Sequence, residues 1–472
     1  MKKVKLPLLY SVALVVVAFV SPGTMAANLA DAYAHAVQND PVLGGAKAQF
    51  QARQQLIPQA RAGLLPSITT GGTSSWNDRE FPDHIPNTVS GVGTLKVPGE
   101  EFNEHGWQAS VQQPVVNLTN WFTYRSARSS VDAAEASLEA VDQNLIVRVI
   151  QAYLNVLRAQ DLLEATIAEE AAVKRQLEQV QQRFDVGLVA ITDVLEAQAA
   201  YDNAVVRRVQ AAGDHDIFFE TLATLTGEPY ESVDRLSITL PIVDPEPSNE
   251  EEWVTTALAT NLAIIAAKAQ LRAAERTVAA RRSGHLPTIT AGINHNHLAT
   301  GGRSFLSGKT DQTTYQVGIS LPIYQGGFTH SLTKEAVALA EQARQELQNQ
   351  RLTVTRDTRN LFRSVATDVV RVSARLKAIA SITSALEATQ TGYEVGTRNI
   401  VDVLQAQQRL YSSQFDYADS RYNYVLDLMF LKQTTGTLIP EDLQELNQFM
   451  DPTDSVHRVT SLSQRSLDLG SQ

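Results

Sequence analysis

Few side chains in this sequence are spaced so that they could carry chemistry. His295 and His297 lie two positions apart and could bind one metal ion, but no third ligand follows nearby. A position in a loop or at an interface is the commoner role for such a pair. The acidic residues Glu100, Glu101 and Glu104 are expected in a solvated loop. No nucleophile motif, phosphate-binding glycine loop or carboxylate pair stands out, so we expect no enzyme, no cofactor and no metal site.

Composition limits the class of protein. The chain has 472 residues, of which 43% are apolar and 19% charged, and it has no cysteine. These values exclude collagen-like, low-complexity and wholly disordered chains, and they allow several domains or one large subunit of an assembly. The lack of cysteine excludes disulfides, thiolate metal sites and a lipidated N-terminal cysteine. A net charge of −11 argues against nucleic acid as a partner.

The first 26 residues predict a secretory signal peptide. Three lysines precede an apolar run from Leu6 to Val20, and small residues around Ala26 provide a cleavage site. The run is short for a membrane span, which makes an uncleaved anchor the weaker alternative. Cleavage would leave a net charge of −14, because the segment carries three lysines and no acid. No later stretch offers about 18 consecutive apolar residues, so membrane insertion of the mature chain would require β-strands.

The rest of the sequence is a tandem duplication. The motif FDVG at 184–187 leads into ITDVLEAQ, and YEVG at 393–396 leads into IVDVLQAQ, 209 residues later. A second pair, LPSI at 65–68 and LPTI at 286–289, lies 221 residues apart. The offsets differ because the segment from the Leu-Pro marker to a later proline is longer in the first half (Pro66 to Pro114) than in the second half (Pro287 to Pro322). This difference predicts a loop of variable length.

Each half predicts one very long helix followed by a shorter one. The stretches 118–182 and 328–391 contain neither proline nor glycine, and their apolar residues recur at steps of three and four. A helix of roughly 65 residues would be about 98 Å long, so it needs coiled-coil partners. The shorter helix of each half is expected to end near Thr226 or Thr435. Two further helical stretches are expected at 29–63, with a break near Pro41, and at 253–283.

Each half also predicts two strands, because the apolar period changes from 3.6 to 2 after the Leu-Pro marker. Alternation over 315–323 is typical of a transmembrane barrel strand, although a half-buried soluble strand shows the same pattern. Four strands cannot close a barrel, since even small closed barrels use about eight, so several chains would have to share one. Aromatic residues that could form membrane girdles lie near the strand ends: Trp76, Trp107, Trp121, Phe122, Tyr124, Tyr324 and Phe328.

Together these features resemble the TolC-like outer-membrane efflux family. The resemblance runs from Ala27 to about residue 450, and QRFDVGLVAITDV at 182–194 and LPIYQGG at 321–327 are among its motifs. It implies a mainly α-helical fold with a membrane part. Three identical chains would each give four strands to a twelve-stranded β-barrel in the outer membrane of a Gram-negative bacterium. A long α-helical coiled-coil barrel would continue this barrel into the periplasm.

The resemblance also gives a domain layout. The segments are the signal peptide 1–26, a first repeat 27–226 with strands at about 65–116 and a turn near 187, an equatorial linker 227–250, a second repeat 251–436 with strands at about 286–323 and a turn near 396, an equatorial C-terminal segment 437–450 and a tail 451–472. The tail is rich in serine and weakly patterned, so we expect it to be disordered.

By the resemblance, a gate lies at the two turns between the long and the shorter helices. Arg398 on the second turn would hydrogen-bond Asp193 and Thr192 on the first turn. Gln176, one helix back, would also bond Arg398. Tyr393 would reach Asp193. These links would hold the inner helix pair closed, and their loss would favour opening. Without the resemblance, Asp193 and Arg398 would be interpreted as exposed charges at helix starts.

The resemblance gives Asp402 a further role. In a trimer, its three copies would form an acidic ring that gives the periplasmic entrance a preference for cations. The family often has a second acid one turn later, where this chain has Gln405. We therefore expect weaker cation selectivity than a two-ring entrance would have.

The residues at the two turn tips, Gly187, Leu188, Gly396 and Thr397, would dock against a periplasmic adaptor protein. Glycine by itself explains the turns, because it adopts the left-handed backbone that they need. The docking role is thus an implication of the resemblance.

The sequence as a whole predicts a passive, homotrimeric outer-membrane exit duct for drug efflux or protein export. The adaptor and an inner-membrane transporter of the RND, ABC or MFS type would open it and supply the energy. The main alternative is a periplasmic coiled-coil scaffold or adaptor with a soluble β-domain, but such a protein needs no lipid-facing strands. A secreted enzyme is a third class, and it would need a catalytic constellation that we do not find.

Overall fold

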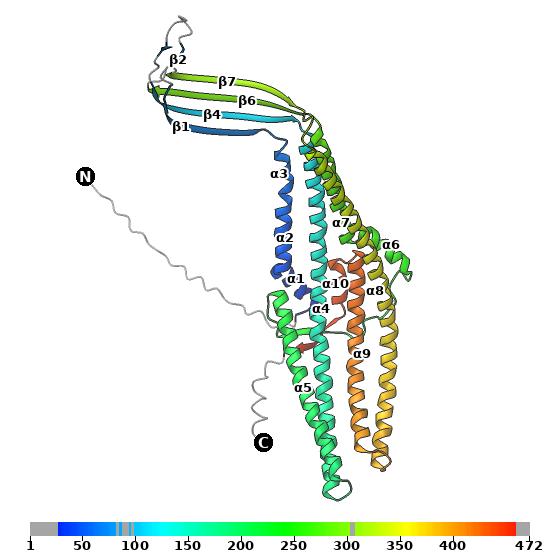
Figure 1. Cartoon of the computed structure of the whole chain (residues 1–472). Helices are drawn as coiled ribbons and strands as arrows, with labels where there is room; N and C mark the ends of the chain where they lie inside the picture. The colour runs from blue at the N-terminus through cyan, green and yellow to red at the C-terminus, as the bar shows by residue number, and fades with distance from the viewer. Residues whose placement is uncertain (1–26, 82–84, 87–93, 96–98, 303–306, 459–472) are drawn as a thin grey trace, which may run out of the picture.

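The computed structural model describes residues 27–81, 85–86, 94–95, 99–302 and 307–458. The predicted signal peptide and residues 459–472 of the predicted tail lie outside the described residues. Figure 1 shows an elongated molecule with a sheet at one end, helices running side by side below it, and two helix turns at the other end.

Two very long helices form the frame of the molecule. Helix α4 (Leu118–Asp185) has 68 residues and α8 (Phe328–Glu394) has 67, which makes each about 100 Å long. Each is followed across a tight turn by a helix of 36 residues, α5 (Ile191–Thr226) or α9 (Ile400–Thr435). The predicted long helices, and the predicted ends at Thr226 and Thr435, are confirmed.

Shorter helices lie beside the upper half of this frame (Figure 1). They are α1 (Leu29–Asn39), α2 (Pro41–Gln54), α3 (Leu56–Ala62), α6 (Glu250–Thr260), α7 (Leu262–Arg282), the 3-10 turn η1 (Ser283–His285) and α10 (Pro440–Asn447). A break separates the first two helices of each half, at Asp40 or Asn261. The side chain of that residue accepts a backbone N–H bond from the next helix and caps it.

The break at Asn261 divides a stretch whose combined length and hydropathy would allow a membrane span. Among the described residues, no single helix is both long enough and apolar enough to cross a membrane. One bent pair, Glu250–Thr260 with Leu262–His285, meets the requirements by length and composition, and its two parts are bent by 41°.

The main sheet is antiparallel, and its strands follow the order β1-β4-β6-β7. The strands are β1 (Ser67–Arg79), β4 (Glu100–Val116), β6 (Thr288–Gly302) and β7 (Gly308–Ser320); the short pair β2 (Ile85–Pro86) and β3 (Thr94–Leu95) lies between β1 and β4 in the chain. Two strands in each half are thus confirmed. The last strand is slightly shorter than the expected span to about residue 323: β7 ends at Ser320, two residues before Pro322, which has no N–H to donate.

The expected loop position of Glu100, Glu101 and Glu104 is also wrong, because all three residues belong to β4. Glu100 is paired with Arg79 of β1, and Glu104 accepts a bond from the side chain of Asn77 at 3.4 Å. Backbone pairing between β1 and β4 continues beyond the apolar part of the strands. It does so because ladder hydrogen bonds do not require apolar side chains.

Register gives the main sheet two different faces. Val111, Ile293 and Tyr315 are paired across three strands, so their side chains lie in one row on one face. Each of these three residues has at least one polar neighbour in its strand, and the side chains of such neighbours point to the opposite face of the sheet. Within the described residues, the edge strands β1 and β7 each pair on one side only, and Tyr315 on β7 is 75% exposed. The chain therefore presents an amphipathic sheet with two free edges.

The largest core lies where the upper helices meet the middle of α4 and the ends of α5 and α9. A small sheet of β5 (Ser232–Leu236) and β8 (Met450–His457) packs against it. The fully buried Tyr153 of α4 connects the two, since its hydroxyl lies 2.9 Å from the carbonyl oxygen of Asp234 and 3.1 Å from that of Ala27.

Strand β8 corrects the predicted disordered tail, because Asp451 and residues 455–457 are paired with β5, on either side of an irregularity. Met450 and Val456 are buried, and Arg458 beyond them donates to Asp216 of α5 at 2.6 Å. A partner strand more than 200 residues earlier in the chain stabilises this segment, and a local sequence pattern does not reveal such a partner.

Two glycines at helix ends allow a test of this packing. Gly436 ends α9 with a φ of 74°, and a Cβ there would overlap the backbone of Thr260; Gly396 has a φ of 80°, with nothing within 4 Å. We expect Gly396→Ala to cost about 1–2 kcal/mol, because it strains only the backbone, and Gly436→Ala to cost clearly more. Thermal or chemical unfolding of the detergent-solubilised variants measures both, and equal losses would contradict the close contact at Gly436.

Candidate functional site at the helix turns

The same turn joins the two helices of each long pair. Gly187 has a φ of 77° and Gly396 a φ of 80°, so both are left-handed, as in a glycine-terminated helix. Behind them, Leu188 N donates to the carbonyl of Arg183 at 2.9 Å, and Thr397 N donates to that of Gly392 at 2.8 Å. The duplicated sequence thus folds into a duplicated turn.

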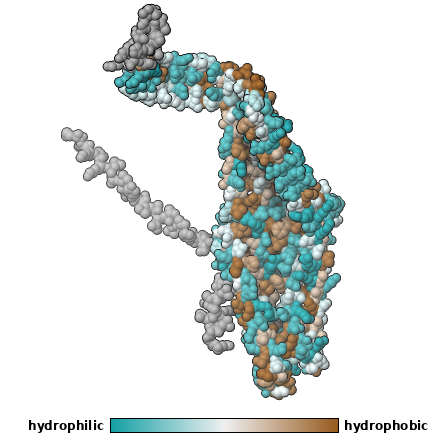
Figure 2. All heavy atoms as spheres, viewed as in Figure 1, coloured by the Kyte–Doolittle hydropathy of each residue, from teal (hydrophilic) through white to brown (hydrophobic). Residues whose placement is uncertain are grey.

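The tips of these turns expose apolar side chains. Val186, Leu188 and Val395 are each 70% exposed, whereas Val180 and Ile400 behind them are buried in a small apolar cluster that joins the two helix pairs. Figure 2 also shows hydrophobic residues at this end of the molecule. The tips thus leave apolar surface that the chain itself does not cover.

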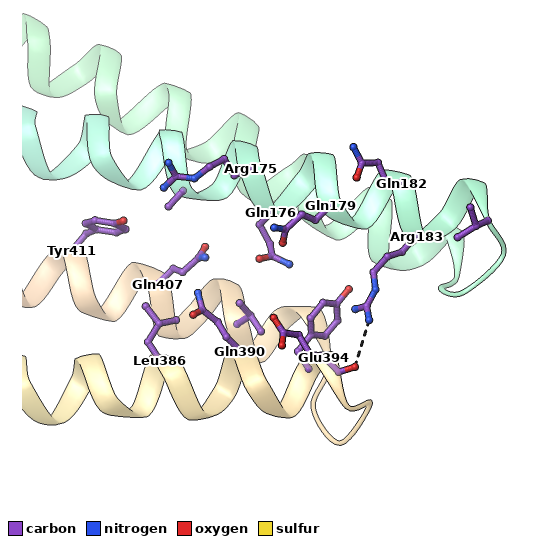
Figure 3. A pocket seen from close by; sticks show the side chains of 14 residues that line it. Arg175, Gln176, Gln179, Gln182, Arg183, Leu386, Gln390, Glu394, Gln407 and Tyr411 are labelled. Atoms are coloured by element: carbon purple, nitrogen blue, oxygen red, sulfur yellow. Dashed lines mark hydrogen bonds between the residues drawn. The ribbon is translucent and has the colours of Figure 1, made fainter.

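A cavity of about 620 Å³ lies between the two helix pairs, just behind the turns. Its lining is mostly polar and comprises Ala172, Arg175, Gln176, Gln179, Gln182, Arg183, Val186, Leu386, Gln390, Tyr393, Glu394, Val403, Gln407 and Tyr411. In Figure 3, Gln176 of α4 and Gln407 of α9 lie on opposite sides of this space. Both are buried, and within the described ranges of the chain neither Gln407 Oε1 nor the Tyr393 hydroxyl has a hydrogen-bond partner.

The structure brings together only some of the predicted gate residues. Gln176 and Tyr393 line the same cavity. Arg398 lies outside it in an exposed turn, with Nη1 3.9 Å from Asp402 Oδ2. Thr192 contacts Asp193 at 3.4 Å. In the part of the chain that the structure describes, no hydrogen bond joins Asp193 to Arg398 or to Tyr393.

Sequence analysis missed Arg183, which connects the two turns. Its guanidinium carbon lies 5.0 Å from the centre of the Tyr393 ring, in cation–π geometry, and its Nη2 donates to the carbonyl of Glu394 at 3.5 Å (Figure 3). Its position directly before the duplicated FDVG motif was the available signal, although the second repeat has Gly392 at the equivalent position.

Asp402 has a structural role within the single chain. It forms a capping box with Asn399: Asp402 N donates to Asn399 Oδ1 at 2.8 Å, and the Asp402 carboxylate accepts from Asn399 N at 3.4 Å. Gln405, three residues later, is exposed. The cap orients the carboxylate at the start of α9, close to the Arg398 side chain.

A buried acid pair between α8 and α9 was also missed. Asp368 is fully buried and lies beside Asp427 of α9, which accepts a hydrogen bond from Ser364. Arg371 donates to Asp368 at 2.5 Å. Burial, and next the charge of Asp427, raise the pKa of Asp368 to about 6.

The two repeats differ at this position. The first repeat has Ala159 and Phe218, 209 residues before the two acids. Further along the first helix pair, Arg207 of α5 donates to both carboxylate oxygens of Glu169 of α4, at 2.7 and 3.2 Å. Opposite charges link α4 to α5 here, whereas α8 and α9 place two acids side by side at the Asp368 position and have an opposite-charge contact, Arg375 to Asp416 at 3.9 Å, further along.

The paired helices, the twin turns and the four-stranded sheet agree with the mainly α-helical fold that the sequence predicts. The sequence model of the family described as outer membrane efflux protein matches residues 32–228 and 253–437. The chain therefore belongs to the outer membrane efflux protein family.

Known relatives extend this match over nearly the whole chain. It is 35% identical over 451 residues to the outer membrane protein TolC of Vibrio cholerae, a match that covers 95% of this chain and 98% of the relative. It is 30% identical over 435 residues to TolC of Escherichia coli, with 90% and 85% covered. The alkaline protease secretion protein AprF of Pseudomonas aeruginosa is 25% identical over 422 residues, with 89% and 86% covered.

Solved structures show the same fold. The outer membrane protein VceC of Vibrio cholerae superposes with a TM-score of 0.72 at 20% identity, covering 86% of this chain and 96% of that one. CusC superposes with a TM-score of 0.75 at 16% identity, covering 87% and 92%. The predicted family, the predicted outer-membrane location and the predicted function as an efflux or secretion channel are confirmed.

The acid pair predicts a dependence of stability on pH. The pKa of Asp368 is about 6 in the folded chain and about 3.9 in an unfolded one. The folded state therefore holds an extra proton in this range, and its free energy of unfolding falls as the pH rises through it. Relative to Asp368→Asn, we expect the thermal midpoint of the natural chain to decrease between pH 4 and 7. Parallel curves for the two proteins would contradict the proximity of Asp368 to Asp427. Asp416→Asn on α9 is the control, because it removes an acid that lies 3.9 Å from Arg375 and not beside a second acid.

Proposed function

We propose that three copies of this chain form one continuous duct. Each copy would give its four strands to a twelve-stranded barrel in the outer membrane, and α4, α5, α8 and α9 would line up into a helical barrel in the periplasm. The single observation that carries this proposal is the pair of free edges on an amphipathic sheet. An open edge in lipid leaves backbone groups without partners, and four strands are too few to close on themselves.

The duct would be passive and would catalyse no reaction. Energy would come from an inner-membrane transporter of the RND, ABC or MFS type, joined to the duct through a periplasmic adaptor. The exposed apolar tips around Gly187, Leu188, Gly396 and Thr397 support adaptor docking at this end. The names of the relatives refer to both export and resistance, as in the secretion protein AprF and the cobalt-zinc-cadmium resistance protein CzcC. We therefore propose efflux and secretion as the classes of transport.

Closure at the periplasmic end would depend on the predicted gate residues meeting in the assembled trimer. The Arg398 guanidinium lies 3.9 Å from Asp402, and among the described residues the buried Tyr393 hydroxyl has no hydrogen-bond partner. Both groups are thus free to bond Asp193 and Thr192 when the helix pairs are brought together. Gln176, already in the shared cavity, would complete the network.

The domain layout supports this assembly. Repeats 27–226 and 251–436 would form equivalent halves of each subunit, and segments 227–250 and 437–450 would form a belt around the helical barrel. The belt would extend further than the sequence predicts, because β8 pairs with β5 up to His457.

Single-channel recording in planar bilayers tests the gate. We expect a small conductance from the natural chain and one several-fold larger from the Arg398→Ser, Tyr393→Phe variant, because the substitutions remove the closing bonds. Arg409→Ser, about three turns along α9, is the matched control and should behave like the natural chain. Unchanged conductance in the double variant would reject the gate and leave the duct intact, whereas no conductance from inserted protein would reject the duct.

The acidic ring gives a separate prediction for ion selectivity. Asp402→Asn keeps a capping side chain and removes the charge, so the preference for K⁺ over Cl⁻ should decrease. Gln405→Asp should increase that preference by adding a second ring. Reversal potentials under a KCl gradient measure both changes. Identical reversal potentials in the three proteins would contradict an entrance ring at these positions.

A further inference from the structure

His295 and His297 of β6 lie on one face of the main sheet, between side chains of β4 and β7. Register places Trp107, His297 and Asp311 in one row across β4, β6 and β7. Ala109, His295 and Thr313 form the adjacent row on the same face, which is also the face of Val111, Ile293 and Tyr315, one row closer to the helices. The two imidazoles therefore project to the same side, about 6.8 Å apart along the strand at their Cα atoms.

Each imidazole is oriented by a partner on β7. His297 Nδ1 lies 2.5 Å from Asp311 Oδ1, and His295 Nδ1 lies 2.8 Å from Thr313 Oγ1. An ionised carboxylate has no proton to give, so His297 donates its Nδ1 proton to Asp311. The lone pair of neutral His297 is then on Nε2, directed away from this bond. The same tautomer follows for His295 when Nδ1 donates to the Thr313 hydroxyl.

Trp107 on β4 keeps the two rings close together. Its ring centre lies 4.9 Å from that of His295 and 6.1 Å from that of His297. Side chains held by packing on one side and by a hydrogen bond at Nδ1 on the other lose little freedom when Nε2 binds a ligand. In known metal sites, a histidine that binds metal through one ring nitrogen commonly donates the proton of its other ring nitrogen to a carboxylate, as His297 does to Asp311.

We propose that His295 and His297 bind one divalent transition-metal ion, such as Cu²⁺ or Zn²⁺, through their Nε2 atoms. Asp311 and Thr313 act as positioning residues that fix the tautomers. Among the described residues, no group of three or more His, Asp or Glu side chains could hold a metal ion. Water would therefore fill the remaining coordination positions, and the site would be open and exchangeable.

The surroundings favour a cation over an anion at this position. Asp311 is 62% exposed beside His297, so an anion would meet a carboxylate. Imidazole nitrogen is a ligand that suits copper, zinc and nickel, and Cu²⁺ binds most tightly among the divalent ions of this series. Cu²⁺ is therefore the most sensitive probe.

His105 provides a matched control on the same face. It lies on β4 one row beyond Trp107, but both of its ring nitrogens are already engaged, with Ser74 Oγ at 3.2 Å and Asn103 Nδ2 at 3.3 Å. Its replacement by glutamine should leave metal binding unchanged.

Cu²⁺ titration of the tag-free, full-length, detergent-solubilised protein tests the proposal, with electron paramagnetic resonance and Trp fluorescence as readouts. We expect one tight Cu²⁺ per chain, hyperfine coupling to two imidazole nitrogens, and quenching that is lost in Trp107→Phe. The His295→Gln, His297→Gln variant should lose this site. Asp311→Asn, which keeps both ligands, should weaken the affinity about 10- to 100-fold.

Several outcomes would overturn the proposal. They are no stoichiometric Cu²⁺ binding by the natural chain, equal binding by the double variant, equal weakening by His105→Gln, and unchanged affinity in Asp311→Asn. Thermal unfolding of each variant shows whether the fold is retained. If the double variant does not fold, the comparison of Asp311→Asn with His105→Gln still decides the question.

Discussion

Backbone hydrogen bonding at the edges of the main sheet is the constraint on which the rest of the architecture depends. Strands β1 and β7 each leave one row of N–H and C=O groups unpaired, and hydrocarbon offers these groups no partner. In an outer-membrane protein, other copies of the chain are the natural source of partners. In the proposed trimer, joining the sheet edges of the copies would also bring their long helices side by side, so that the β-barrel and the helical barrel would form together.

The duplicated helix pairs then provide a conduit that can change at one end. Both pairs end in the same glycine turn, but their interfaces differ. Arg207 and Glu169 join α4 to α5, whereas α8 and α9 bury Asp368 beside Asp427. Arg371 offsets part of the repulsion between the two acids, but ionisation of both still weakens this contact, which distinguishes the α8–α9 interface from the α4–α5 interface. The duplicated sequence gives two helix pairs of the same shape. The residues at their interfaces have diverged, so the two pairs would respond differently in the proposed gate.

Much of this fold could be predicted from local pattern. The absence of proline and glycine over 118–182 predicted α4, and period-two alternation predicted the strands, because both signals lie within one element. Strand β8 was missed because its partner β5 lies more than 200 residues earlier and its own sequence contains Pro452. At the candidate site, the motif located the turns, but it did not show that Arg183 covers Tyr393. Contacts between elements depend on packing, which a repeat in the sequence does not reveal.

Disulfide cross-linking between β1 of one copy and β7 of the next shows whether the free sheet edges of several copies join. Because the chain has no cysteine, each new bond reports only on the introduced pair. Thr70→Cys on β1 would be combined in turn with Thr313→Cys, Tyr315→Cys or Val317→Cys on β7, and oxidised in native membranes. β1 and β7 lie at opposite edges of the sheet in one chain, so a bond must join two chains. The account predicts that at least one register yields covalent dimers and trimers and nothing larger. Absence of cross-links in every register from folded, inserted protein, or a ladder that continues beyond three chains, would contradict it.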